Sequence, residues 1–163
     1  MRISAKWLNR AEWLSYMRSL MSPSRLVHLE RGVGRAAIRV QQMMRENLES
    51  MIYQQPPAAS GYIRTRTLFR STHAAAPGTE HGGDQSRAFA GGDLAATVPE
   101  NVVVRRGTEI ASEVGSWIRY AGFVHEGVNQ PSPRPFVKAA EEGAKQVLRE
   151  EVEQGVRDMV ATR

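Results

Sequence analysis

The sequence predicts an α+β fold in which a long N-terminal helix and a C-terminal helix pack on a small, mainly antiparallel β-sheet. Apolar residues recur at steps of three and four over two long segments, as on one face of an amphipathic helix. Between these segments, β-branched and aromatic residues cluster in short runs, which is typical of strands. The length of 163 residues suits one core, so residues 1–163 are expected to form a single domain.

Two helices are predicted in the first third of the chain. The first covers residues 9–21, where apolar residues return at helical spacing. Ser22 is a favourable N-cap and Pro23 a favourable first helical residue, so a second, longer helix is expected to begin there and to continue to about Tyr53. Its apolar stripe consists of Leu26, Leu29, Val33, Ala37, Val40, Met44, Leu48 and Met51.

Two glycines and a row of arginines stand out in this second helix. Gly32 and Gly34 each weaken a helix by about 1 kcal/mol relative to alanine, so they mark either a kink or a close approach by another backbone. Arg31, Arg35 and Arg39 are spaced by four and lie on the side opposite the stripe. Such a row fits a solvated face, an acidic neighbouring subunit or DNA in a channel.

The middle of the chain predicts β-structure around a long loop. The segment QQPPAA at 54–59 ends the helix, and residues 62–70 are expected to form a strand or an extended arm. Residues 74–100 are rich in Gly, Ala and Pro without periodicity, which predicts a flexible insertion loop. Residues 102–104 form a short strand core, and residues 110–128 are expected to add one or two strands to an antiparallel sheet.

A second long helix is predicted from Phe136 onward. Pro131, Pro133 and Pro135 give a stiff, extended approach to it. Its expected apolar stripe consists of Ala140, Ala144, Val147, Leu148, Val152, Val156 and Met159.

The charge of the chain is divided unequally along its length. The formal net charge is +5. Most of the basic residues are arginines, which suit bidentate contacts to carboxylates or phosphates. A GC-rich genome would produce the same excess of arginine over lysine. Residues 1–70 carry twelve basic and four acidic residues, a balance of +8, and residues 71–163 carry ten and thirteen, a balance of −3. A head-to-tail contact between copies can use such an asymmetry, in which the positive face of one copy meets the negative face of the next.

Composition also bears on where the protein works. The sequence contains no cysteine, so assembly is expected to depend on packing and polar contacts. No apolar run is long enough to cross a bilayer, and charges stand where a signal peptide would have its apolar centre. The chain is therefore expected to be made in a cytoplasm and to have no membrane partner.

Several fragments resemble catalytic signatures but lack an essential residue. His125-Glu126 begins like the HExxH zinc motif, yet Asn129 stands where the second histidine is required. Gly32 and Gly34 lie within a helix pattern rather than between a strand and a helix, and no Gly-Lys-Ser or Gly-Lys-Thr occurs. The histidines are scattered. We therefore expect no enzyme activity, cofactor or metal.

The C-terminal half carries a resemblance to a known family. The block YAGFVHEG at 120–127, followed by PRPFVKAA at 133–140, resembles the C-terminal signature of a neck or head-to-tail connector family of tailed bacteriophages. In that family a strand of this kind precedes a Pro-Phe that starts the last helix; here the aromatic residue usual between Glu126 and Gly127 is absent. The segment RTRTLFRS at 64–71 is similar to a further family segment with its glycine replaced, and the similar pieces together span about residues 23–160.

This resemblance implies a structural, non-catalytic virion protein of the phage neck, made in the cytoplasm of the host bacterium. Copies would form a homo-oligomeric ring that joins the DNA-filled head to the tail. Its partners would be head-side connector or adaptor proteins and the tail terminator or tail tube proteins, with DNA only passing through the channel. Residues expected to serve as subunit contact or scaffold are Arg31, Arg35, Arg39, Tyr120, Phe123, Glu126, Pro135 and Phe136.

Three alternatives remain open from the sequence. Within the same class, the protein could be the tail terminator that caps the tail tube. From another class, the positive N-terminal part suits a small basic DNA-binding protein, although no recognition helix or row of aromatics on successive strands is evident. A hydrolytic enzyme is the third choice.

Overall fold

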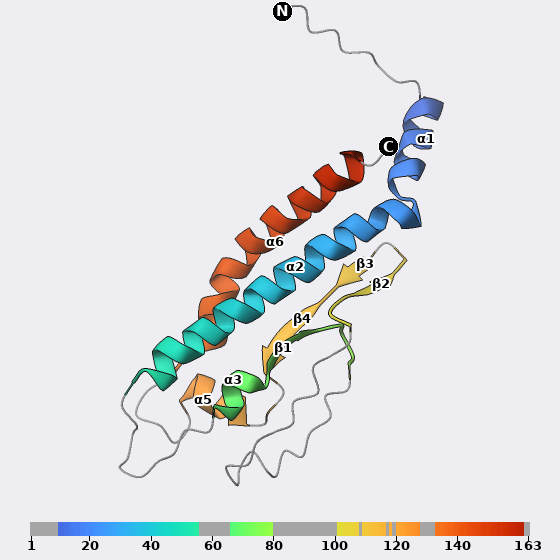
Figure 1. Cartoon of the computed structure of the whole chain (residues 1–163). Helices are drawn as coiled ribbons and strands as arrows, with labels where there is room; N and C mark the ends of the chain where they lie inside the picture. Colours follow the sequence, from blue (N-terminus) through green and yellow to red (C-terminus); the bar gives the residue numbers. More distant parts are fainter. Residues whose placement is uncertain are drawn as a thin grey trace, which may run out of the picture.

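The computed structural model describes residues 10–55, 66–79, 101–107, 109–116, 118, 120–127 and 133–161 (Figure 1). Long helices and short antiparallel strands make up an α+β fold, as predicted. The elements, in chain order, are α1 (Arg10–Leu20), α2 (Pro23–Leu48), the π-helix η1 (Glu49–Tyr53), α3 (Thr67–Arg70), β1 (Thr72–Ala75), β2 (Val104–Arg106), β3 (Glu109–Ala111), β4 (Glu113–Ser116), α5 (Tyr120–Glu126) and α6 (Phe136–Ala161).

The two N-terminal helices are confirmed, with the interruption where it was predicted. Ser22 is extended at φ −64° and ψ 145°, and its carbonyl oxygen accepts hydrogen bonds from the backbone N–H groups of Arg25 and Leu26 at 3.0 Å each. Pro23 then occupies the first turn, where its missing N–H group costs nothing. The helical run continues through η1 to Tyr53, which is the predicted end.

The long helices α2 and α6 pack along each other, and α2 lies between α6 and the strands (Figure 1). The two helices approach closely at glycines. A Cβ atom at Gly32 would lie 2.6 Å from the carbonyl oxygen of Glu151, and one at Gly155 would lie 2.8 Å from that of His28. Gly32 was predicted to mark either a kink or a close approach by another backbone. The structure shows the close approach, by the backbone of α6. Gly34 meets the strand side instead, with a Cβ distance of 3.2 Å to Cγ2 of Val103.

The strands form two antiparallel pairs. β1 pairs with β4, with Thr72 opposite Ser116 and Ala75 opposite Glu113. β2 pairs with β3, with Val104 opposite Ala111. All four residues of β1 are buried, and its backbone is tied to α2, because Gln41 accepts a hydrogen bond from the N–H of Ala74 at 2.8 Å. The antiparallel pairing was predicted.

Two predicted strands are helices instead. Residues 67–70 form α3, where the neighbours Thr67 and Leu68 are both buried, although in a strand they would point to opposite faces. Residues 120–126 form α5, because Tyr120, Ala121 and Val124 pack against the core at helical spacing. The prediction of a strand over 110–128 therefore holds only for β3 and β4.

Two other predictions in this region need adjustment. Gly127, at φ 76°, follows the last residue of α5 in the left-handed conformation common after a helix, so it ends a helix rather than a strand. The expected loop 74–100 begins later than predicted, because Ala74 and Ala75 belong to β1 and a turn follows them. Residues 80–100 lie outside the described residues, as do 56–65.

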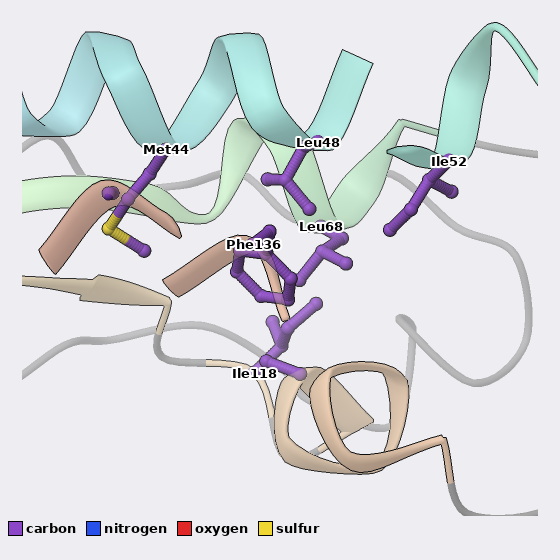
Figure 2. Packing of buried hydrophobic residues seen from close by; sticks show 8 residues of the cluster. Met44, Leu48, Ile52, Leu68, Ile118 and Phe136 are labelled. Atoms are coloured by element: carbon purple, nitrogen blue, oxygen red, sulfur yellow. The ribbon is translucent and has the colours of Figure 1, made fainter. Parts of the chain in front are cut away.

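One apolar core joins the end of the helix pair to the shorter elements. Figure 2 shows the ring of Phe136 among Leu48, Leu68 and Ile118, which come from different parts of the chain. Phe136 is fully buried. Burying a phenylalanine side chain stabilises the folded state by roughly 2–3 kcal/mol relative to leaving it in water. The core is completed by Met44, Ile52, Ala121 and Ala140.

Candidate subunit-contact surface

The segments 120–127 and 133–140, taken together as one block, meet in space. The imidazole of His125 on α5 lies edge-on to the ring of Phe136 at the start of α6, with centroids 5.5 Å apart and planes at 81°. Tyr120 is half-buried and packs against the same core. The block therefore forms one packed unit although its halves are separated in the sequence, and Phe136 and Tyr120 belong to the scaffold.

Other residues of the same block face outward. Phe123 is 53% exposed on α5. Glu126 and Pro135 are also exposed, and Val137 on the first turn of α6 is 37% exposed. An exposed phenyl ring costs free energy in water unless another surface covers it. Of the predicted residues, Phe123, Glu126 and Pro135 are thus available for contact.

The arginine row on α2 is divided by the structure. Arg35 forms an ion pair with Glu151 of α6, Nε to Oε2 at 2.7 Å. Arg39 contacts the same carboxylate at 3.0 Å and also Glu150 at 3.2 Å. Arg31 is exposed and makes no ion pair with any described residue. Two of the three guanidinium groups therefore tie α2 to α6, and part of the charge asymmetry along the chain is used within one copy.

These ion pairs change the protonation of the groups that form them. Hydrogen bonds from Arg35 and, more weakly, from Arg39 lower the pKa of Glu151 below its ordinary value. The pKa of Arg39 is raised in turn, mainly by its hydrogen bond to Glu151. Because the folded pKa of Glu151 is lowered, its stabilising contribution is present above the ordinary glutamate pKa of about 4.3 and is lost as the pH falls through the lower folded value.

Replacing Glu151 with glutamine is expected to lower the free energy of unfolding at pH 7 by about 1 kcal/mol, since the ion pairs are partly solvated. The difference from the parent protein should shrink as the pH is lowered below about 4. Denaturant unfolding at several pH values measures it. Glu153→Gln, which removes an exposed carboxylate that pairs with Arg157 at 3.6 Å, is the matched control and should change little. A Glu151→Gln effect that persists undiminished at low pH would contradict the assignment.

The outer face of α6 departs from the predicted stripe. Ala140, Val147 and Met159 are buried as expected, but Leu148 is 45% exposed and Val156 is 40% exposed. Val160 is 50% exposed and extends the same row. Two stripe residues are thus surface residues, because α6 packs mainly on α2 and no described element covers this apolar flank. The sequence signal was present: five apolar residues at four-residue intervals, Ala144, Leu148, Val152, Val156 and Val160.

A cluster of arginines and aromatic rings was not predicted. The guanidinium carbons of Arg45 and Arg66 lie 5.4 Å and 5.8 Å from the ring centre of Phe69. Arg66 also pairs with Glu49 at 2.7 Å and has φ 58°, the only positive φ outside glycine among the described residues. Burial lowers the pKa of Arg45, which donates to the carbonyl oxygen of Thr72 at 2.8 Å. This cluster fastens α3 to the end of α2, and no spacing in the sequence indicates it.

Within the described parts of the chain, no three histidine, aspartate or glutamate side chains are arranged to hold a metal ion. None of the helices described has the length and apolar character needed to cross a membrane. A small open pocket lies beside the β2–β3 hairpin and is lined by Pro77, Val104, Arg106, Glu109, Ala111, Ser112 and Glu113.

Comparison of the chain with models of protein families, with curated proteins and with solved structures gives no match.

Proposed function

We propose that this chain is a structural subunit of the neck of a tailed bacteriophage. Copies form a ring that joins the DNA-filled head to the tail, with head-side connector proteins on one face and tail proteins on the other. The block at 120–127 and 133–140 supports this proposal through its resemblance to the connector family, and its two segments pack together through His125 and Phe136.

The observation that carries the proposal is the exposure of Phe123. Its neighbours in α5, Ala121 and Val124, belong to or pack against the core, yet the phenyl ring is 53% exposed. Aromatic residues are enriched in protein interfaces and often dominate their binding energy. A contact surface centred on α5 would explain why an aromatic side chain at position 123 faces outward.

Two other functions compete less well. A tail terminator would use the same kind of ring, and co-purification with tails rather than with heads would identify it. A basic DNA-binding protein would need its arginines free for phosphates, and the pairing of Arg35 and Arg39 with Glu151 counts against this use of the row. A hydrolytic enzyme draws no support from the described residues.

Replacing Phe123 with glutamate is expected to impair joining strongly while leaving the protein folded, since the side chain is outside the core. Loss of an interface aromatic costs about 2 kcal/mol or more, so joining should fall at least about tenfold. The assay adds purified protein to heads and tails from cells that lack it and counts infectious particles.

Two control variants distinguish a contact made by Phe123 from a chemical role of His125. Phe123→Leu keeps an apolar surface and should retain most joining. His125→Ala removes the imidazole beside Phe136 and should still join, although with some loss of stability. If Phe123→Glu joins heads to tails as well as the parent protein, the contact assigned to α5 is wrong. If His125→Ala assembles intact particles that are not infectious, a chemical role for that histidine replaces the structural one.

A further inference from the structure

The segment 109–116 has one strand edge without a partner among the described residues. It pairs with β2 through Glu109–Ala111 and with β1 through Glu113–Ser116, and both partner strands lie on the same side of it (Figure 1). The N–H of Ala76 donates to the carbonyl oxygen of Asn101 at 2.9 Å, which joins the end of β1 to the approach to β2. The other side of 109–116 pairs with no described strand.

Hydrogen bonding shows which backbone groups face this open edge. The N–H of Ala74 in β1 donates to Gln41 of α2, so it does not bond its partner Val114 in β4. At such a position of an antiparallel pair, both residues turn their N–H and C=O groups outward, and these positions alternate along the strand. Val114, Ser112 and Ile110 therefore present backbone groups to the open edge, where no described residue bonds them. An unpaired edge of this kind accepts a further strand.

The two faces of the segment 109–116 differ in character. Val114 packs against the apolar core, so the even-numbered residues face α2. Glu109 and Glu113 are exposed on the opposite face, about 13 Å apart, with the half-buried Ala111 between them. Neither carboxylate forms an ion pair with a described residue, although Arg106 lies opposite Glu109 in β2. A strand that fits this edge would be apolar toward α2 and basic on the other face.

The sequence before α1 has this pattern. Residues 1–9 lie outside the described residues, and their sequence is MRISAKWLN. Polar and apolar residues alternate in it: Arg2, Ser4 and Lys6 against Ile3, Ala5 and Trp7. A period of two predicts a strand with one polar and one apolar face. The two basic residues are four positions apart, as are the two glutamates of the open edge.

We propose that residues 2–6 of one copy add a strand to the open edge of the next copy. This inference rests on the proposed ring and names a contact that holds the ring together. Antiparallel pairing then gives these opposite positions on the exposed face: Arg2 with Glu113, Ser4 with Ala111 and Lys6 with Glu109. The apolar residues between them fall on the face toward α2. The contact joins two different surfaces, which is the kind that generates rings.

The direction of α1 favours the next copy over the same copy. α1 extends away from the strands (Figure 1), and its 11 residues span about 16 Å. The steps from Lys6 to the start of α1 at Arg10 span at most about 14 Å. The hairpin end of the open edge lies near the other end of α1, because Arg105 donates to the carbonyl oxygen of Pro23 at 3.4 Å. The chain is therefore too short to return to its own edge.

Disulfide trapping tests the contact, because the chain contains no cysteine. One protein carries Ser4→Cys and another Ala111→Cys, a pair whose Cα atoms in the proposed register lie about 4.5–5.5 Å apart, close enough for a disulfide. The two are mixed, oxidised and separated without reductant, in solution and after joining heads to tails. We expect a link between the two different proteins, and a ladder of covalent multimers when one chain carries both substitutions. Val137→Cys, at an exposed position on α6, is the control and should link poorly to Ser4→Cys.

Exchanging the charges tests the register independently. Glu109→Lys combined with Glu113→Lys in the Ala111→Cys protein should lower the yield of the link about fivefold at low salt, since each pair would become repulsive. Adding Arg2→Glu and Lys6→Glu to the Ser4→Cys protein should restore the yield. Restoration is expected only if the two sets of charges face each other, because damage to the fold would not be repaired from another copy.

Other occupants of the open edge give other patterns. A link confined to one chain would mean that the segment folds onto its own edge. Equal linking of Ser4→Cys to Val137→Cys and to Ala111→Cys would mean that the segment has no fixed place. Absence of the Ser4–Ala111 link both in solution and in joined particles would leave the edge to another partner. Each result overturns the inference. Joined particles without the link would leave the proposed function standing, whereas the link without joining would support the contact and count against the function.

Discussion

Replacing Gly32 with alanine is expected to lower the free energy of unfolding by about 1–3 kcal/mol, the typical cost of an extra methyl group forced into a packed interior. The added Cβ would lie 2.6 Å from the carbonyl oxygen of Glu151, and backbone cannot move aside as a side chain can. The helices would have to separate, which would also stretch the ion pairs from Arg35 and Arg39. Gly155→Ala, with a contact at 2.8 Å to the backbone of His28, should act in the same way.

Two other glycines supply matched controls for this experiment. Gly143 lies on the same helix seam, but a Cβ there would meet the flexible end of the Met43 side chain, so the cost of Gly143→Ala should be smaller. At Gly122 of α5 nothing lies within 4 Å, so alanine should be neutral or should stabilise by up to about 1 kcal/mol through helix propensity. Denaturant unfolding measures all four variants. If Gly32→Ala is as stable as Gly122→Ala, the close approach of α2 and α6 is wrong.

The long helices could be predicted because their signals are local and repeated. The stripe from Leu26 to Met51 recurs over many turns, and Ser22-Pro23 marks the start of α2 within one residue. Gly32 could be flagged as unusual, but only the position of α6 explains it. Antiparallel pairing could also be predicted, since short strands separated by turns favour it.

The short elements could not be assigned in the same way. The segments 67–70 and 120–126 are rich in β-branched and aromatic residues, and such short runs suit a strand or a helix equally well. Burial decided between them: Thr67 and Leu68 are both covered, and Tyr120 with Val124 meets the core on one side of a helix. The family resemblance reinforced the wrong choice at α5, because it implied a strand there.

The candidate contact surface could be predicted only in part, because sequence spacing does not tell which residues another part of the chain covers or pairs with. Periodicity places Leu148 and Val156 on an apolar stripe but does not tell whether anything covers it. The row of Arg31, Arg35 and Arg39 was found, but its partners Glu150 and Glu151 are more than 110 residues away in the chain. Which arginine is paired depends on the register between α2 and α6, and no local pattern contains that register.

Removal of the protein from infected cells should give the largest effect on function. The exposed side chains of Phe123, Leu148, Val156 and Val160 are the candidate contact surfaces of the proposed neck subunit. We therefore expect DNA replication, packaging and lysis to proceed, and joining alone to fail.

Electron microscopy of a lysate from such cells is the most direct test of the proposed neck function. The expected picture is DNA-filled heads beside separate tails of normal appearance, which become infectious particles when the purified protein is added. A lysate of complete, infectious particles, or one of empty heads, would contradict a role in joining head to tail.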